Sequence, residues 1–244
     1  MDNTDKGTVA SNIVAIFRIE FRPWVHKNIG ALSMVKSLLL TSFATWLSHH
    51  RTNSSDDLLG HLAQRNCLPQ PYFVLRQLPV DFFLAPQLVL TEIEAKKPDV
   101  ILCCGMAEKR DKLALESRGT NGDLFLETTA NLEAIAADLP HTEISHDAGT
   151  FVCNSLYYRL LEELRDRNSK AQCLFVHVPL IDETNLEAIL ADFNTIIRRF
   201  LAAQTTEFVI PSYDRFLKPE PRPKQRLASL DIKTNTRQLL RESR

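Results

Sequence analysis

Glycine is scarce in this sequence, with only 7 residues among 244, and neither a G-x-G-x-x-G segment nor a P-loop occurs. Both motifs use glycine so that backbone N–H groups can approach a phosphate closely. Their absence excludes the two commonest glycine-rich nucleotide sites.

Paired cysteines are also missing. The five cysteines form an odd set without any C-x-x-C spacing, and they are Cys67, Cys103, Cys104, Cys153 and Cys173. This pattern gives no sign of a disulfide framework or of a cysteine-pair zinc motif. With no signal peptide visible, the pattern predicts reduced thiols in a cytoplasmic protein.

No excess of charge of either sign is present: 29 Lys and Arg face 30 Asp and Glu, for a net charge of −1. The whole chain therefore gives no electrostatic argument for nucleic acid or an anionic membrane surface as a partner. The longest apolar stretch, residues 29–47, is interrupted by Lys36 and by several Ser and Thr. We therefore predict no membrane span and no nucleic-acid partner.

Strand-like and helix-like segments alternate between residues 36 and 204. Strands are expected at 37–41, 73–75, 99–104, 112–116, 142–145 and 173–178, and helices at 54–65, 86–97, 129–139, 184–203 and from about 153. The alternation predicts an α/β protein, a three-layer α/β/α sandwich with a mostly parallel central sheet. Sites in such sheets lie at the carboxyl ends of the strands.

Both ends of the sequence differ from this central part. Residues 1–35 are expected to be an N-terminal extension that includes a strand-like run at 15–21, although Met34 is also a possible start. Residues 205–244 are rich in proline and then basic, which predicts a loosely held tail.

The segment around Cys153 is typical of a helix start. Asp147, or Thr150, precedes an apolar-periodic run and would serve as the N-cap. Cys153 then falls in or just before the first turn, where free N–H groups and the helix dipole favour a thiolate. A buried cysteine that only fills the core is the alternative.

Two further polar residues have suggestive positions. His177 lies near the carboxyl end of an apolar strand, and Glu116 ends a short apolar run. A Cys–His–Glu set suits nucleophilic attack on a carbonyl: the imidazole takes the thiol proton, and the carboxylate fixes the tautomer of the imidazole. Each residue alone has an ordinary explanation, as a core histidine or a solvated glutamate.

A family resemblance joins these residues. Residues 148–158 (Ala-Gly-Thr-Phe-Val-Cys-Asn-Ser-Leu-Tyr-Tyr) resemble the active-site cysteine segment of the pyroglutamyl peptidase I family of cysteine peptidases. Residues 175–179 resemble its histidine strand, and residues 97–107 with Glu116 resemble its glutamate segment. Residues 76–80 also match, and the resemblance runs from about residue 36 to residue 203.

The resemblance implies that Cys153 is the nucleophile, His177 the general base and then acid, and Glu116 the residue that orients His177. It further implies removal of an N-terminal pyroglutamyl residue from peptides through a thioester, an α/β/α fold, no metal or cofactor, and a homo-oligomer, commonly a tetramer. The residues it implies for substrate contact are Phe43, Trp46, Met106 and Val152.

One segment departs from the family. Residues 42–47 (Ser-Phe-Ala-Thr-Trp-Leu) stand where the family has a Gly-Phe-x-Pro-Phe-Gly-type sequence, so Phe43 is kept and Trp46 replaces the second phenylalanine. The stretch between Glu116 and Cys153 is also shorter. Two alternatives therefore stay open: the same triad acting on another small blocked substrate, or a catalytically silent scaffold protein. His49 and His50, with His61, are interpreted as a surface loop.

Overall fold

The structure is a computed structural model, and it describes residues 36–203. The expected strand at 15–21 and the tail from residue 205 lie outside this range. The strands are β1 (Leu38–Phe43), β2 (Tyr72–Leu78), β3 (Val100–Met106), β4 (Leu113–Glu116), β5 (Arg118–Asn121), β6 (Leu124–Glu127), β7 (Thr142–Ser145) and β8 (Gln172–Val178). The helices are α1 (Ser54–Gln64), α2 (Leu84–Lys96), α3 (Leu132–Ala136), α4 (Val152–Asp166) and α5 (Leu186–Ala202).

Six strands form one sheet in the order β2-β1-β3-β8-β4-β7. Neighbouring strands are parallel except for β4 and β8, which are antiparallel. The expected mostly parallel sheet is confirmed. Every residue of β3 is buried, as expected for its continuous apolar run between β1 and β8.

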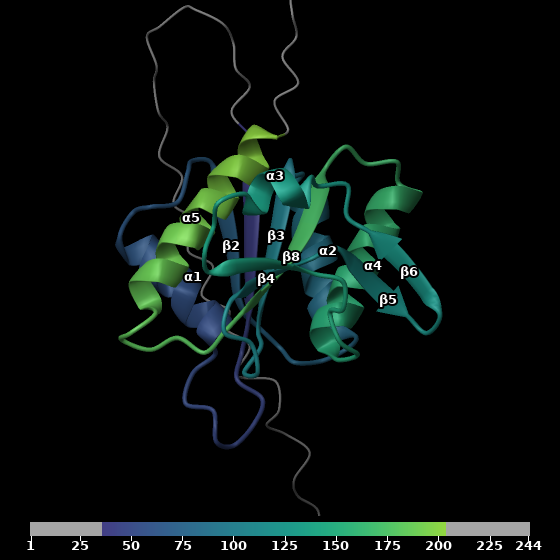
Figure 1. Ribbon diagram of the computed structural model, residues 1–244. Helices are drawn as coiled ribbons and strands as arrows, with labels where there is room; N and C mark the ends of the chain where they lie inside the picture. The colour runs from purple at the N-terminus through teal and green to yellow at the C-terminus, as the bar shows by residue number, and fades with distance from the viewer. Residues whose placement is uncertain (1–35, 204–244) are drawn as a thin grey trace, which may run out of the picture. The chain divides into compact units, whose positions relative to one another are not determined.

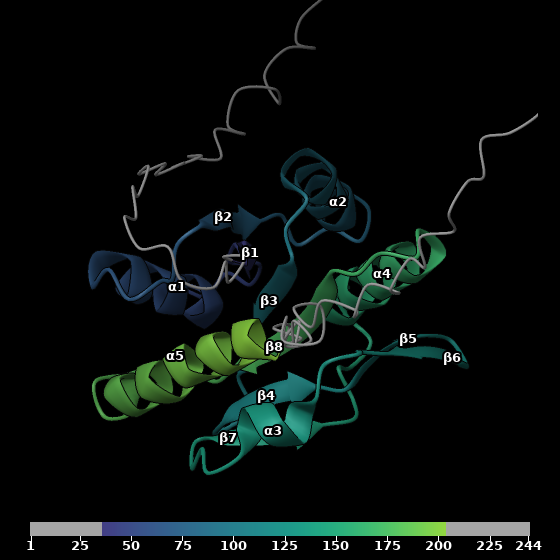
Figure 2. The same cartoon turned by 90° about the horizontal axis from the view of Figure 1, so that it is seen from above.

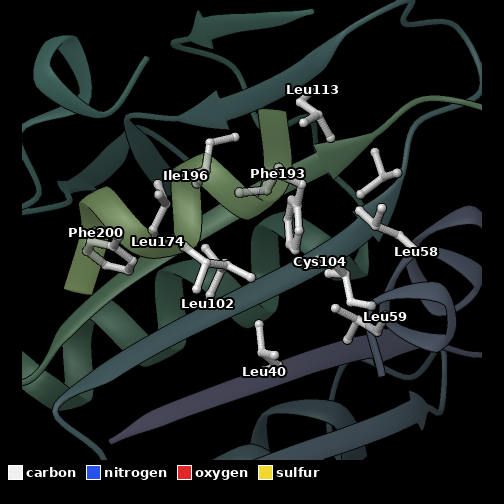
Figure 3. Close-up of a cluster of buried hydrophobic side chains, with 14 of the residues drawn as sticks. Leu40, Leu58, Leu59, Leu102, Cys104, Leu113, Leu174, Phe193, Ile196 and Phe200 are labelled. Atoms are coloured by element: carbon white, nitrogen blue, oxygen red, sulfur yellow. The ribbon is translucent and has the colours of Figure 1, made fainter. Parts of the chain in front are cut away.

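Helices cover both faces of this sheet (Figures 1 and 2). Side chains from α1, α3 and α5 pack on one face, with Leu58, Phe193 and Phe200 among the most buried (Figure 3). Side chains from α2 and α4 pack on the other face, around Tyr157 and Phe175. The three-layer α/β/α sandwich is therefore confirmed. None of the described helices combines the length and apolar character needed to cross a bilayer.

Some local predictions were wrong. The hairpin of β5 and β6 was not predicted; its turn contains Gly122, whose φ of +60° favours glycine. The helix expected at 129–139 is only the short α3. Helix α5 has Asn185 as its N-cap, which makes no side-chain cap bond. Asp182 accepts the N–H bonds of the preceding turn.

Candidate functional site

The site lies where β3 and β8 end on the face covered by α2 and α4. Gly105 of β3 pairs with His177 of β8. Alternation along β8 directs His177 to the same face as Phe175, and their ring centroids are 4.9 Å apart. A methyl group on the Cα of Gly105 would stand 2.6 Å from the Sγ of Cys153 and 2.9 Å from the Phe175 ring. Cys153 and His177 therefore belong to one small region above two adjacent strands.

Helix α4 presents Cys153 in its first turn, as expected. The N-cap is Phe151 rather than Thr150 or Asp147, and no side chain caps the helix. Asp147 instead accepts a hydrogen bond of 2.9 Å from the Gly149 N–H within the preceding turn. This correction matters chemically, because the N–H groups of the first turn of α4 are not used by a capping side chain.

Burial works against the expected thiolate. The Sγ of Cys153 lies against Gly105, and burial raises the pKa of this thiol to about 12. The nearby Cys103 and Glu116 side chains raise the pKa further, while the Cys153 N–H lowers it. The cost of desolvating a charged sulfur thus opposes the effect of the helix terminus, and burial favours the neutral form of the Cys153 thiol.

Glu116 is the last residue of β4, but it reaches His177 from the interior of the sheet rather than from the edge where β8 ends. Because β4 is antiparallel to β8, Ala114 pairs with His177 and Glu116 pairs with Phe175, one step deeper in the sheet. The Glu116 side chain is fully buried, and its Oε1 lies 2.7 Å from the His177 Nδ1. Placing the carboxylate on Nδ1 leaves the Nε2 of the imidazole for proton transfer.

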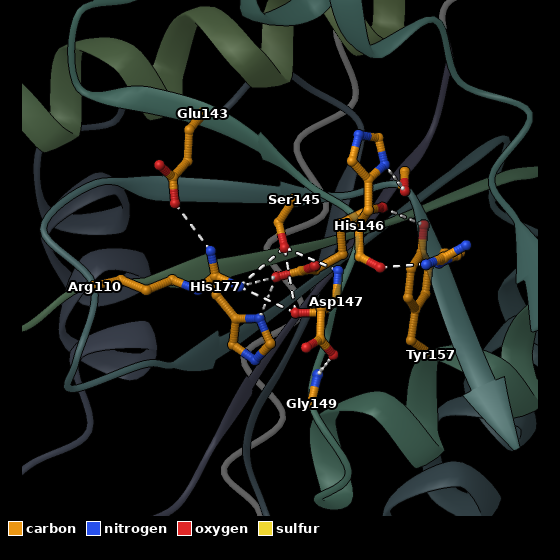
Figure 4. A network of polar contacts seen from close by, with 11 residues as sticks. Arg110, Glu143, Ser145, His146, Asp147, Gly149, Tyr157 and His177 are labelled. Atoms are coloured by element: carbon orange, nitrogen blue, oxygen red, sulfur yellow. Dashed lines mark hydrogen bonds and ion pairs between the residues drawn. The ribbon is translucent and has the colours of Figure 1, made fainter. Parts of the chain in front are cut away.

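Arg110, which the sequence analysis did not single out, ties this carboxylate to the segment before α4 (Figure 4). Its guanidinium donates to Glu116 Oε1 at 3.2 Å, to Ser145 Oγ at 2.9 Å and to the Asp147 carbonyl at 3.1 Å. A further bond of 2.9 Å reaches Glu143. Arg110 compensates the buried negative charge of Glu116 and connects it to the chain that leads to Cys153. Arg110 lies in the loop after β3, where no sequence pattern indicated a functional role.

Helix α4 is also anchored directly. The Tyr157 hydroxyl donates to the Glu116 carbonyl oxygen at 2.9 Å, and the Tyr157 ring packs 5.8 Å from that of Phe175. One turn after Cys153, the helix is therefore fixed to both β4 and β8. This bond limits movement of the cysteine relative to Glu116 and His177.

The four residues expected to contact substrate occupy different environments. Phe43 and Val152 are buried at 2% and 1% exposure, within the core between the sheet and α4. Met106 follows Gly105 in β3, so its side chain lies on the opposite face of the strand. It is directed toward α1, where its Sδ accepts the Ser54 N–H at 3.4 Å. The structure therefore places Met106 on the opposite face of the sheet from Cys153.

Trp46, the fourth residue, joins a group of aromatic rings beside the helix start. Its ring centroid lies 6.1 Å from that of Phe151, and Phe151 lies 5.7 Å from Phe82 in an edge-to-face contact. Phe82 and Phe151 are about half exposed, at 53% and 46%. Phe151 lies two residues before Cys153, and this proximity in sequence could have indicated a place near the site. These rings offer an apolar wall near the thiol.

An open groove of about 1220 Å³ runs between α2 and α4. Its lining includes Phe82 and Phe83 from the start of α2 and Thr150 and Asn154, which flank Cys153 in sequence. The groove is large enough for several residues of an extended peptide.

One group of side chains could hold a metal ion. His49 and His50 lie beside Glu108, and the three potential ligand atoms are within 4.8 Å of one another. The sequence interpretation of a plain surface loop did not include Glu108, which follows β3 and is distant in sequence. His61, the third histidine considered there, is on α1 and outside this group.

Known proteins resemble this chain in both sequence and fold. The sequence profile of the family described as Pyroglutamyl peptidase matches residues 129–202. A pyrrolidone-carboxylate peptidase of Brevibacillus brevis is 30% identical over 45% of this chain and 63% of its own length. One from Vibrio vulnificus is 29% identical over 61% of this chain and 81% of its own length.

The chain is thus similar to the pyroglutamyl peptidase family in the sequence of residues 129–202 and in its fold. The aligned region covers less than two thirds of the Brevibacillus brevis protein and about four fifths of the Vibrio vulnificus protein. Pyroglutamyl peptidase I of Bacillus amyloliquefaciens shares the fold, with a TM-score of 0.61 at 21% identity over 70% of this chain and 97% of its own. A pyrrolidone carboxyl peptidase of Thermococcus litoralis gives 0.60 at 19% identity, over 68% and 94%.

Proposed function

We propose that this protein is a cysteine peptidase that removes an N-terminal pyroglutamyl residue from peptides. Similarity to the pyroglutamyl peptidase family supports the substrate, and the arrangement of Cys153, His177 and Glu116 supports the chemistry. The observation that carries the proposal is the contact of the Cys153 Sγ with Gly105, the strand partner of His177, on one face of the sheet.

Attack begins from a neutral thiol. As the Sγ of Cys153 bonds to the carbonyl carbon of the pyroglutamyl residue, its proton passes to the Nε2 of His177. The Glu116 carboxylate on Nδ1 stabilises the imidazolium that forms. Because the resting thiol has a pKa of about 12, proton transfer and carbon–sulfur bond formation are coupled, and no standing thiolate is required.

The tetrahedral intermediate then collapses. Its oxyanion lies near the first-turn N–H groups of α4, which no side chain caps. The C–N bond breaks, the imidazolium gives its proton to the leaving amine, and a thioester of Cys153 remains. Water attacks the thioester with His177 as base; pyroglutamate leaves, and the sulfur regains its proton.

No metal or cofactor takes part in this scheme, because His177 carries every proton that is transferred. The remainder of the peptide would occupy the groove between α2 and α4, which starts beside Thr150 and Asn154. The five free cysteines support residence in a reducing compartment such as the cytoplasm.

A homo-oligomer, as in the family, is the proposed assembly. Exposed apolar side chains of Phe83, Leu124 and Phe125 support it, with exposures of 85%, 64% and 54%. Light scattering after size exclusion would measure the mass directly. A strictly monomeric protein at micromolar concentration would contradict this part of the proposal.

The substrate is tested with a panel of aminomethylcoumarin amides under reducing conditions. The pyroglutamyl amide should be cleaved, while the prolyl, glutaminyl and alanyl amides should not, because they lack the lactam or carry a free amine. Cleavage of one of the other amides in preference to the pyroglutamyl one would show a different specificity. No cleavage of the pyroglutamyl amide would refute the proposed function.

A further inference from the structure

Three potential metal ligands lie together beside Trp46, and none of them belongs to the triad. His49 and His50 are in the segment after β1, and Glu108 is in the loop after β3. β1 and β3 are parallel neighbours in the sheet, so the segments that follow them emerge at the same edge. We propose that His49, His50 and Glu108 bind a first-row transition metal ion of the Zn²⁺ type. The proposal does not depend on the peptidase activity.

The donor atoms fit such an ion. Imidazole nitrogens and a carboxylate oxygen are common ligands of Zn²⁺, whereas Mg²⁺ and Ca²⁺ prefer oxygen ligands alone. The His49 Nε2 lies 3.4 Å from the Glu108 Oε1. Ligands about 2.0–2.1 Å from a tetrahedral zinc ion are separated by roughly 3.3 Å. These two atoms therefore already have the spacing of two ligands of one ion.

The second imidazole faces the same oxygen. The His50 Nε2 contacts Glu108 Oε1 directly, and an ion would enter by separating these two atoms. The two histidine rings are 4.3 Å apart at an angle of 68°, so both Nε2 atoms can converge on one point. Water would complete the tetrahedron, because the His49 side chain is 67% exposed.

One side of the site is already fixed. The His50 side chain is only 4% exposed, and the Trp46 ring packs against it edge-on at 4.5 Å. The His50 N–H also donates to the Leu47 carbonyl at 3.0 Å, which closes a turn. Because one ligand is held before the ion arrives, less conformational entropy is lost on binding. The same contacts link the site to Trp46, which lies in the aromatic wall near Cys153.

Binding is measured by isothermal titration of Zn²⁺ into full-length protein carrying Cys153→Ser. That substitution removes the catalytic thiol, a competing zinc ligand. One equivalent should bind, and His49→Ala or Glu108→Gln should weaken binding by roughly tenfold or more. His61→Ala is the matched control and should bind like the parent. Both test substitutions change side chains with substantial solvent exposure, so each variant should fold.

A Co²⁺ titration identifies the ligands. The proposal expects the visible bands of tetrahedral cobalt without a thiolate charge-transfer band, together with quenching of tryptophan fluorescence, because Trp46 packs on His50. A thiolate band, or Zn²⁺ affinity that His49→Ala and Glu108→Gln leave unchanged, would overturn the site. In that case the trio is only a hydrogen-bonded His–Glu–His group. Neither readout uses substrate, so failure here is distinguishable from failure of the proposed peptidase.

Discussion

Gly105 and Cys153 touch: a side chain as small as a methyl group on Gly105 would come within 2.6 Å of the Cys153 Sγ. The same methyl group would also come within 2.9 Å of the Phe175 ring. Phe175 is fully buried and cannot retreat. The position of the nucleophile therefore depends on the absence of a side chain in the neighbouring strand.

Gly105→Ala should greatly reduce hydrolysis of the pyroglutamyl amide, because the sulfur must move away from the His177 side of the strand pair. We expect a loss of kcat of roughly 100-fold, as for misplacement of a reacting group by about 1 Å. Gly122→Asn is a matched control. Gly122 has φ +60° and no atom within 4 Å of an added Cβ, and Asn tolerates that conformation. Wild-type kcat in Gly105→Ala would contradict the proposed position of the sulfur.

Arg110→Ala should lower kcat by about ten- to 100-fold, the equivalent of a charged hydrogen bond of about 1.5–3 kcal/mol. Added guanidinium ion should restore part of the activity, because it can occupy the space beside Glu116 and Ser145. If Arg110 acted only in folding, Arg110→Ala would be less stable than wild type and added guanidinium would not restore its activity. Glu143→Gln removes only the exposed arm of the network and should leave kcat nearly unchanged.

Glu116→Gln tests the carboxylate on His177. Loss of the charge should lower kcat by roughly 10³- to 10⁴-fold, since the imidazolium would no longer be stabilised. The Oε2 of Glu116 is buried without a hydrogen-bond partner among the described residues. An amide NH₂ at that position would be unsatisfied and should destabilise the fold by about 1–3 kcal/mol. Activity within a fewfold of wild type would remove Glu116 from the mechanism.

The pH dependence of alkylation tests the protonation state of Cys153. The pKa of this thiol is raised to about 12, so the thiolate fraction should rise about tenfold per pH unit below that value. Iodoacetamide inactivation of free enzyme should therefore accelerate steadily from pH 7 to pH 11. A rate that reaches a plateau below pH 7 would show a standing thiolate and contradict the coupled attack. Peptide mapping would confirm Cys153 as the modified residue.

The sequence was sufficient to predict the layers of the fold, because β3 and β8 are continuous apolar runs and α4 has a clear apolar period. What it could not supply was strand direction. The sequence of the short β4 is compatible with a parallel or an antiparallel neighbour. Because β4 is in fact antiparallel to β8, Glu116 approaches His177 from within the sheet.

Residues from irregular segments were the hardest to predict. Arg110 and Glu108 lie in the loop after β3, where no periodicity connects them to distant partners. The environment of Cys153 was not predicted for a related reason: a helix start is visible in a sequence, but the packing that raises the pKa of its thiol is not. Met106 was assigned to the substrate by resemblance, whereas strand alternation turns it toward α1.

Cys153→Ala gives the most direct test of the account, measured beside wild type with the pyroglutamyl coumarin amide under reducing conditions. Both proteins are purified identically, and circular dichroism verifies that the variant folds. The account predicts hydrolysis by wild type and a loss of roughly 10⁴-fold or more in the variant. Equal rates in the two preparations would show that the Cys153 sulfur does not form the bond to the substrate.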